Sequence, residues 1–575
     1  MDNFFTENKD MQLIFDNTDL TEIIDLKEGD YSDAKQFDYA FTDAEDAKSG
    51  YREVLTLIGE ICGQIIEPLA PEVDEEGCHF NAGVVTYPKG IQRDMEILKK
   101  SNLMGFTLPR RYGGLNFPSY VYTIAIEMVS QADASLMNIF GLQDIGDTIN
   151  EFANEELKAK YLPLFTSGQV TGAMALTEPD AGSDLQAVQL KAIYDESNDT
   201  WHLNGVKRFI TNGCGDVLLV LARSEPGTKD GRGLSMFVCE KDESLVVRRI
   251  ENKLGIHGSP TCELQFNNTR AYLVGKRRMG LIRYVMSLMN GARIGVSAQG
   301  LGIAHAAYLE GLDYAKAREQ FGTAIVNMPL VYDMLLNARI SVEAARLLLY
   351  DTSRVVDLKK GYEEKLAHTE PPSKELRETA KYYSSLAALL TPISKYISTE
   401  YANKVSYDML QVHGGTGYMK DFNIERHYRD ARITNIYEGT TQLQFVAAIG
   451  GVVTQVMEPE LDKMEAQLVE DFQKPYLKEL KEKRELLNKA VHYIKEKNDH
   501  AYQSYYSGRL VDMTAKIYTS YLFLKYAAFS EEKKRTADIY FEREMPEIEK
   551  NYEMVVSGSR GAIDQFSDVL LEENT

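Results

Sequence analysis

The feature that most limits how this chain can fold is a change in hydrophobic periodicity near its middle. Between residues 170 and 279 the apolar residues come in short runs rich in β-branched types, such as VLLVLA and LSMFVCE, separated by turn sequences such as GTKDGRG. Such runs are typical of strands. On both sides, over 46–169 and 280–450, apolar residues recur at the spacing of an amphipathic helix. The pattern predicts a mainly α-helical protein with a small central β domain between two helical domains.

The two ends of the chain differ from this central part. A chain of 575 residues exceeds what one hydrophobic core supports, so several domains are expected. Residues 1–45 are acidic but carry apolar side chains such as Phe4, Phe5 and Ile14, which predicts a short arm that docks on the body. Residues after 450 return to a helical pattern and predict a helical appendage. The predicted divisions are 1–45, 46–169, 170–279, 280–450 and 451–575.

The composition argues against several classes of protein. Lys and Arg number 64 against 86 Asp and Glu, a formal charge of −22, which repels polyanions and makes nucleic acid an unexpected partner. The cysteines lack CxxC spacing and the histidines lack HExxH spacing, so we expect reduced thiols and no metal. No run of about eighteen apolar residues occurs, and the N-terminus lacks a basic region before an apolar core. We therefore expect no transmembrane segment and a cytoplasmic location.

One glutamate, Glu438 in NIYEGTTQLQ, stands among residues that can control its charge. The spacing of Thr441 and Gln444 predicts a capping box and a helix that begins near Thr441, with Glu438 on the turn before it. The positive end of that helix favours a carboxylate, whereas an apolar wall formed by Ile436 and Tyr437 would raise its pKa. Opposed effects of this kind tune a carboxylate as a base. Most glutamates are simply solvated, however, so Glu438 alone carries little weight.

Other stretches along the chain indicate backbone that approaches a ligand. Upstream of Glu438, Gly414, Gly415 and Gly417 predict a turn whose N–H groups can face phosphate or carbonyl oxygens. Within the β domain, AMALTEPDAGSD (173–184) predicts an irregular loop, and RFITNG (208–213) ends in an Asn-Gly turn. Each of these is weak alone, because Gly and Pro mark ordinary turns as well.

In this order, and together with KLGIHGSPTCEL, YAKAREQFG and IYEGT, these stretches resemble the signatures of the acyl-CoA dehydrogenases. The resemblance covers about residues 46–450. It implies a helical N-terminal domain, a small β domain and a C-terminal bundle of the four-helix type. Longer members of that family carry a further helical appendage, as 451–575 does here. Phe209 stands where the family has tryptophan and can still stack on a flat ring.

The resemblance also implies an activity. Removing hydrogens from the α and β carbons of an acyl thioester needs a base and a hydride acceptor, and no amino acid accepts a hydride. The family uses FAD, whose N5 takes the hydride, and the glutamate of YEGT as the base, which is Glu438 here. The resemblance further implies an electron-transfer flavoprotein as the acceptor. It implies a homo-oligomer too, and the appendage favours a dimer over the tetramer of shorter members.

Matched position by position, the resemblance implies contacts for three parts of the ligands. The flavin ring and its linker would meet Met174, Leu176, Thr177, Phe209, Ile210, Thr211, Thr440 and Gln442. The pyrophosphate and adenosine of a neighbouring subunit's cofactor would meet Arg318, Gln320, Phe321, Gln411, Val412, His413, Gly414 and Gly415. The acyl-CoA would meet Ser183, Asn290, Arg293 and Gly439. Asn290 replaces an aspartate common in the family, so a purely structural role for it is equally open. Ala292 stands where some members keep their base and cannot accept a proton.

Two alternatives remain beside the dehydrogenase. An acyl-CoA oxidase would use the same base and flavin but let dioxygen reach N5, so peroxide formation separates the two. A non-catalytic, nucleic-acid-associated relative would keep the fold, but the intact IYEGT and the acidic appendage argue against it, because phosphate binding needs a basic surface. The sequence leaves open the length, branching and aromaticity of the acyl group, and the physiological acceptor.

Overall fold

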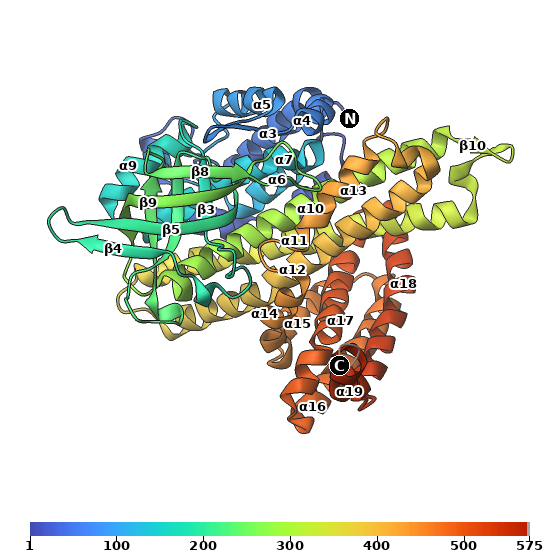
Figure 1. Cartoon of the computed structure of the whole chain (residues 1–575). Coiled ribbons are helices and arrows are strands. Elements are labelled where there is room, and N and C mark those ends of the chain that lie inside the picture. Colours follow the sequence, from blue (N-terminus) through green and yellow to red (C-terminus); the bar gives the residue numbers. More distant parts are fainter. Residues whose placement is uncertain (572–575) are drawn as a thin grey trace.

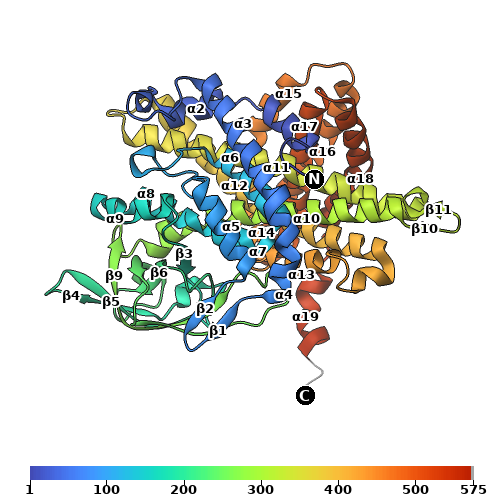
Figure 2. The same ribbon diagram turned by 90° about the horizontal axis from the view of Figure 1, so that it is seen from above.

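The computed structural model, which describes residues 1–571, consists of helical domains packed on one another and a single β domain at their side (Figure 1). The predicted fold class is confirmed: the chain is mainly helical, its strands gather between residues 172 and 274, and a helical extension follows the C-terminal bundle. Figure 2 shows the β domain on one side of the long helices and the extension on the other.

The N-terminal helical domain packs against the bundle through α6. Its members are α3 (Ala44–Ile61), α4 (Ala70–Glu76), α5 (Lys89–Lys100), α6 (Ser119–Ala132), α7 (Ala134–Phe140), α8 (Ile145–Phe152) and α9 (Glu155–Thr166), with a small hairpin of β1 (His79–Asn81) and β2 (Val84–Thr86). Among the described residues one helical stretch, Ala44–Glu76, is long and apolar enough to cross a membrane. Its residues Tyr51, Leu55 and Ile58 are buried in the protein core, as in a helix packed inside a folded domain.

The first residues form two short helices, α1 (Lys9–Asn17) and α2 (Thr21–Glu28), that are built into the body. Asp10 forms ion pairs with Arg346 of the bundle at 2.6 Å and with Lys533 of the C-terminal extension at 2.5 Å. These two cations hold the pKa of Asp10 at about 2, against the effect of its burial. The segment predicted as an arm therefore joins the bundle to the extension.

The β domain is a seven-stranded sheet. Its strands are β3 (Gly172–Ala175), β4 (Lys191–Asp195), β5 (Thr200–Thr211), β6 (Val217–Arg223), β7 (Leu234–Glu240), β8 (Leu245–Ile250) and β9 (Thr261–Val274). The order is β3-β6-β4-β5-β9-β7, with β8 also on β9, and β7 pairs back with β6 so that the sheet closes on itself. The ends of β3 and β5 point toward the helical bundle, and they carry two of the predicted motifs.

Three long helices dominate the C-terminal domain and cross the molecule side by side (Figure 1). The helices are α10 (Met286–Ala317), α11 (Pro329–Ala367), α12 (Lys374–His413), α13 (Ile424–Thr434) and α14 (Thr441–Val453). Gly302 lets α10 approach α6 closely, since a Cβ there would lie 2.5 Å from the carbonyl oxygen of Glu127 in α6. The strands β10 (Glu319–Gln320) and β11 (Thr323–Ala324) form a hairpin that projects where α10 turns into α11.

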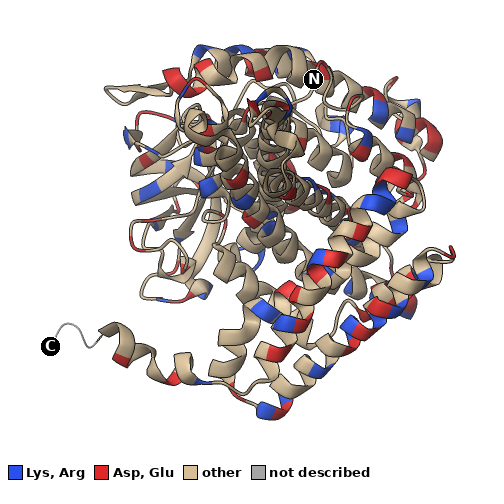
Figure 3. Cartoon of the chain, turned by 90° about the vertical axis from the view of Figure 1, so that its right-hand side faces the viewer, with Lys and Arg blue, Asp and Glu red and all other residues tan. Residues whose placement is uncertain are grey.

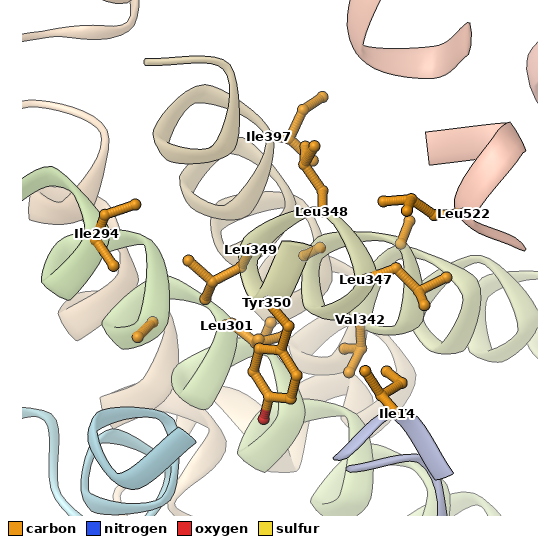
Figure 4. Packing of buried hydrophobic residues seen from close by; sticks show 14 of the residues in the cluster. Ile14, Ile294, Leu301, Val342, Leu347, Leu348, Leu349, Tyr350, Ile397 and Leu522 are labelled. Atoms are coloured by element: carbon orange, nitrogen blue, oxygen red, sulfur yellow. The ribbon is translucent and has the colours of Figure 1, made fainter. Parts of the chain in front are cut away.

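The extension packs on α11, α12 and α14. It contains α15 (Glu458–Gln467), α16 (Gln473–Lys497), α17 (His500–Ala527), α18 (Glu531–Val556) and α19 (Gly561–Leu571). Figure 4 shows Ile14 of α1, Val342 of α11, Ile397 of α12 and Leu522 of α17 in one cluster of buried side chains. The N-terminal segment, the bundle and the extension thus share a single hydrophobic core.

Candidate active site

The loop 435–440 joins α13 to α14 and carries Glu438. As predicted, α14 begins at Thr441, with Thr440 as its N-cap. The predicted capping box is wrong, because Gln444 Nε2 donates to the carbonyl of Gly439 at 2.7 Å, and the Thr441 hydroxyl donates to Glu400. The amide of Gln444 therefore holds the carbonyl side of the loop and does not reach back to the N-cap N–H. Glu438 adopts φ +54° and Gly439 φ +90°.

A lysine that the sequence reasoning missed lies beneath this loop. Lys395 of α12 is fully buried, and its Nζ donates to the carbonyls of Tyr437 and Gly439 at 2.8 and 2.6 Å. The signal that could have found it is a lone charged residue, the lysine, in the otherwise uncharged helical run LLTPISKYIS. A buried lysine is rare without partners, so its position alone suggests a specific set of acceptors.

Burial and nearby cations act on Glu438 in opposite directions. Burial raises the pKa of the Glu438 carboxyl, and the positive charges of Lys395 and Arg293 lower it. Burial likewise lowers the pKa of Arg293, and it lowers that of Lys395 to about 7. The predicted apolar wall is confirmed only in part. Tyr437 lines the cavity, whereas Ile436 is 42% exposed and is not among the lining residues. Opposed effects on the pKa of Glu438 are therefore present, but Lys395 and Arg293 supply the lowering that was predicted from the start of the helix.

Glu438 opens onto a cavity of about 250 Å³. Its walls come from α6, α7, α8, α10, α11, α12 and the ends of β3 and β5, and they include Met137, Asn138, Met174, Thr211, Asn290, Ala292, Tyr437 and Glu438. Charged side chains also line it, namely Asp144, Asp147, Glu151, Lys359 and Lys360, and the sequence reasoning did not single these out. Glu438 is the only one of the predicted site residues in this wall that can act as a base, since Ala292 carries no proton acceptor.

Only some of the β-domain residues predicted to meet a flat ring line this cavity. Met174 and Thr211 line it, whereas Leu176 and Ile210 are buried in the domain behind. Phe209 keeps half of its surface exposed and adopts φ +61°. Thr177 accepts a hydrogen bond from the Arg208 N–H through its carbonyl at 3.0 Å. Ser183 lies exposed on the loop that follows β3, outside the cavity wall.

The remaining predicted residues near Glu438 lie on the helices. Arg293 Nη1 donates to Asn290 Oδ1 at 3.1 Å, so the asparagine orients the arginine within α10. A Cβ built on Gly439 would lie 2.8 Å from Gln444 Nε2 and 3.8 Å from Arg293 Nη2, so a side chain at this position would collide with the Gln444 amide. Thr440 and Gln442 lie on the first turn of α14.

The residues predicted to meet the pyrophosphate and adenosine lie far from Glu438. Arg318, Gln320 and Phe321 are on the projecting hairpin, which the axial rise of α10 places roughly 36 Å from Arg293. Gln411, Val412 and His413 end α12, roughly 24 Å from Lys395, and Gly414 and Gly415 follow on a 3₁₀ turn (Gly414–Tyr418). The Tyr314 ring stacks on His413 at 4.2 Å and so joins the base of the hairpin to the glycine turn. A flavin ring beside Glu438 is therefore out of reach of Phe321 of the same chain.

The residues near Glu438 and those near the hairpin both offer surfaces that a dinucleotide can bind. Phe209 presents an aromatic face to solvent, and Cβ atoms built on Gly414 and Gly415 meet nothing within 4 Å. Several buried polar atoms have no partner among the described residues, including Arg293 Nε, His413 Nε2 and Gln444 Oε1. Buried polar groups are normally paired, so these atoms indicate places where a ligand can bind. Among residues 1–571, no group of three or more His, Cys, Asp or Glu side chains could hold a metal ion.

Arg429 and Asp430 of α13 connect this helix to two other domains. Arg429 binds Asp74 of α4 at 2.5 Å, and Asp430 accepts the N–H of Ile256 in the β domain. They fix the position of α13, and with it the start of the Glu438 loop.

Comparison with known proteins agrees with this geometry. Family models of the acyl-CoA dehydrogenase N-terminal, middle and C-terminal domains match residues 51–169, 173–269 and 282–448. A model described as acyl-CoA dehydrogenase C terminal matches residues 454–559. Together the four models span most of the chain, including the extension.

Individual proteins show the same likeness. An acyl-CoA dehydrogenase of Bacillus subtilis is 37% identical over 353 residues, which is 60% of this chain and 85% of that one. A chain from structural work on the electron transferring flavoprotein of Acidaminococcus fermentans is 30% identical, with a TM-score of 0.59 over 69% of this chain and 96% of that chain. An acyl-CoA dehydrogenase of Bacillus anthracis complexed with FAD has a TM-score of 0.74 over 90% of this chain and 89% of its own, at 24% identity, and so shares the fold along the extension too.

Proposed function

This chain belongs to the acyl-CoA dehydrogenase family of flavin-dependent oxidoreductases, and we propose that it removes hydrogens from the α and β carbons of an acyl-CoA thioester to give the 2-enoyl-CoA. The observation that carries the proposal is the placement of Glu438. It is the one proposed base in the wall of the cavity, and burial raises its pKa while two cations lower it. A carboxylate so balanced can accept a proton near neutral pH.

In this proposal Glu438 takes the α proton of the bound thioester. As the proton leaves, negative charge grows on the thioester oxygen and needs preorganised donors. The N–H of Glu438 donates to no acceptor among residues 1–571. It is therefore available to that oxygen. Arg293 supplies a fixed positive charge nearby, and Asn290 orients it.

FAD is the cofactor proposed to accept the β hydride when bound. Met174, Thr211 and the exposed ring of Phe209 would hold its flavin end beside Glu438. Leu176, Thr177 and Ile210 would support that contact from within the β domain, and Thr440 and Gln442 would meet the linker at the start of α14, whose positive end favours phosphate oxygens. Ser183 and Gly439 are proposed to contact the thioester arm.

The exposed residues of the β10–β11 hairpin support the proposal of a homodimer. Phe321 is 97% exposed at its tip, and among the described residues the side chains of Arg318 and Gln320 bond to no residue outside the hairpin. A second copy would bring Arg318, Gln320, Phe321 and the turn from Gln411 to Gly415 to the other end of the first copy's FAD. The extension covers faces of α11, α12 and α14, which favours a dimer over a tetramer.

We propose an electron-transfer flavoprotein as the acceptor and a β-oxidation type of reaction, in the cytoplasm. An oxidase reaction with dioxygen is the second candidate, because the same base and flavin serve both. A nucleic-acid-associated role is disfavoured: Figure 3 shows basic and acidic residues mixed along the outer helices of a chain whose net charge is −22.

The test is direct. The purified protein should be yellow, and an acyl-CoA added anaerobically should bleach its flavin absorbance. A panel of thioesters of varied length and branching would identify the substrate, and peroxide released in air without an added acceptor would move the assignment to an oxidase. A folded protein that binds no FAD on reconstitution would rule the proposal out.

A further inference from the structure

Lys395 holds the Glu438 loop from below by a pair of hydrogen bonds. Its side chain leaves the middle of α12, is completely buried, and donates to the carbonyls on both sides of Glu438, those of Tyr437 at 2.8 Å and Gly439 at 2.6 Å. We propose that Lys395 is a positioning residue for the base: its ammonium fixes the turn that aims the Glu438 carboxylate and N–H into the cavity. This inference rests on the proposed function of Glu438.

The conformation of the turn explains why such a clamp is needed. Glu438 has φ +54°, a region that residues with a Cβ adopt at a cost and keep only when their surroundings enforce it. The turn directs the two flanking carbonyls inward, away from solvent, where each needs a donor. Lys carries three donors on one flexible stem, so a single Nζ can satisfy two carbonyls that converge from different residues.

Two further contacts show that the loop is held as a unit. Gln444 Nε2 shares the Gly439 carbonyl with Lys395, at 2.7 Å. On α12, Glu400 accepts hydrogen bonds from Asn435 Nδ2 at 3.0 Å and from the Thr441 hydroxyl, so it holds the two ends of the loop. Lys395 and Glu400 lie roughly 7.5 Å apart along the helix. Two side chains from the same part of α12 therefore hold both the centre and the ends of the turn.

Charge adds a second effect of Lys395 on the base. The charged groups that face Lys395 are Glu438 on the loop, Arg293 on α10 and Glu400 on its own helix. Its ammonium lowers the pKa of Glu438, which favours the ionised base, and burial brings the pKa of Lys395 itself down to about 7. Removing the charge should therefore leave Glu438 protonated at a higher pH than in the parent.

The test compares three variants as holoenzymes. Lys395→Met removes the donor and the charge at similar length, and Lys395→Arg keeps the charge but not the single nitrogen between two carbonyls. The matched control is Lys404→Met, a mostly exposed lysine farther along α12 whose ammonium pairs with Asp408 and makes no contact with the Glu438 loop. The measurements are FAD content, the dissociation constant of the acyl-CoA, the rate of flavin reduction against pH, and amide hydrogen exchange of a peptide spanning 435–441.

We expect Lys395→Met to bind FAD and acyl-CoA nearly as the parent does but to reduce its flavin on the order of 100-fold more slowly, the loss typical of a small misplacement of a reacting group. Its acid limb should move to higher pH and its 435–441 amides should exchange faster. Lys395→Arg should recover part of the rate and the parent's acid limb, and Lys404→Met should match the parent in every measurement.

If Lys395 acts by positioning Glu438, its loss matters little once Glu438 can no longer accept a proton. Lys395→Met should therefore lower the rate of flavin reduction much less in a Glu438→Gln background than in the parent. Equal losses in both backgrounds would overturn the inference, as would a Lys395→Met holoenzyme that reduces flavin within a few-fold of the parent. If Lys395→Met fails to fold, Lys395→Arg decides, and a parent-like rate and pH profile together with parent-like exchange in that variant would refute a positioning role. A parent that reduces no flavin with any acyl-CoA would instead refute the proposed function, while unchanged exchange of 435–441 would separately refute the clamp.

Discussion

Two turns in this molecule place a side chain in the left-handed region with the same φ of +54°, Glu438 on its loop and Phe321 on the projecting hairpin. The Glu438 turn is held by buried groups of the same chain, above all Lys395 and Gln444. The Phe321 turn has no such support. Its residues Phe321 and Gly322 form a two-residue hairpin of the type that prefers Asn or Asp at the first position, yet this position holds a phenylalanine that is 97% exposed.

The difference divides the proposed site into two halves. We call the part around Glu438 the finished half, because its turn is held within one chain, and the part around Phe321 the unfinished half, because its turn is not. Strained backbone persists where its surroundings enforce it, and around Glu438 those surroundings are complete within one chain. At Phe321, no packing contact within one copy of the chain, over the described residues, compensates for an exposed aromatic ring on an unfavourable turn. Under the proposed function, the half of the site around Glu438 would be supplied by one chain, and the half that meets the adenosine would need a second chain.

The largest expected effect tests the finished half. Glu438→Gln keeps the volume and the backbone N–H but removes the proton acceptor, so FAD and acyl-CoA should still bind while flavin reduction falls by about 100- to 10,000-fold. Rapid mixing, with rates normalised to bound FAD, measures this loss. A mutant within a few-fold of the parent rate would show that another group takes the proton. Lower FAD content with normal reduction of the remaining holoenzyme would show that Glu438 is structural.

The next effect tests the unfinished half. Phe321→Asn places a residue that suits the hairpin turn better, so the turn itself should be kept while the aromatic ring is lost. If the ring stacks on the cofactor of a second copy, FAD affinity should fall by roughly ten-fold or more, the range expected for losing one stacked aromatic contact. Fluorescence titration of apoprotein with FAD and sedimentation velocity measure the two consequences.

The control for Phe321→Asn is Lys316→Ala. Lys316 lies just before the hairpin, and its only ion pair is with Asp313 on the same exposed helix face. It should leave FAD affinity and association unchanged. Parent-like FAD affinity in Phe321→Asn, or full activity in a monomer, would refute the role given to the second copy.

A smaller effect concerns the charge around Glu438. Arg293 lowers the pKa of Glu438, so Arg293→Met should make the carboxyl hold its proton to higher pH. A base works only when deprotonated. The rate of flavin reduction should therefore begin to fall at a higher pH as the solution is acidified, while the rate at alkaline pH changes less.

The pH profile of single-turnover flavin reduction measures this shift. Arg249→Met is the matched control, since Arg249 pairs with Glu251 and Glu263 on the β domain and lies outside the cavity wall. An acid limb that stays in place in Arg293→Met would mean that Arg293 does not act on the ionisation of the base.

Local pattern was enough to predict the architecture. The strands β6, β7 and β8 coincide with the β-branched runs, and α10 and α12 with the long helical stretches, because both periodicities are properties of neighbouring residues. The same reasoning placed the start of α14 at Thr441. The choice of Glu438 as the base stays a prediction, although the structure puts it in a cavity wall where burial raises its pKa and two cations lower it.

Contacts between distant residues were beyond the sequence. Lys395 and Glu400 reach the loop across more than thirty positions, and their role follows from how α12 packs, which no local spacing encodes. The capping box failed for the same reason, because Glu400 competes for the Thr441 hydroxyl. The N-terminal segment had the apolar anchors of a docking arm, but its link between bundle and extension depends on Arg346 and Lys533, which are hundreds of residues away.

The smallest expected effect concerns Phe209, whose ring is proposed to stack on the flavin. Its ring is half exposed at φ +61°, with the Arg208 guanidinium 4.6 Å from its centre on one side, so the other face is free to stack. Phe209→Trp enlarges that face and should tighten FAD binding by about 1 kcal/mol, or roughly five-fold. Phe209→Leu keeps an apolar side chain of similar size but removes the aromatic face, and it should weaken binding by a similar factor. Titration of the apoproteins with FAD measures both, and thermal unfolding of the apoproteins serves as the control, since an exposed ring contributes little to the stability of the unliganded fold. Equal FAD affinity in the Leu and Trp variants would show that Phe209 does not stack on the flavin, and the finished half of the site would then have to hold its ring through Met174 and Thr211 alone.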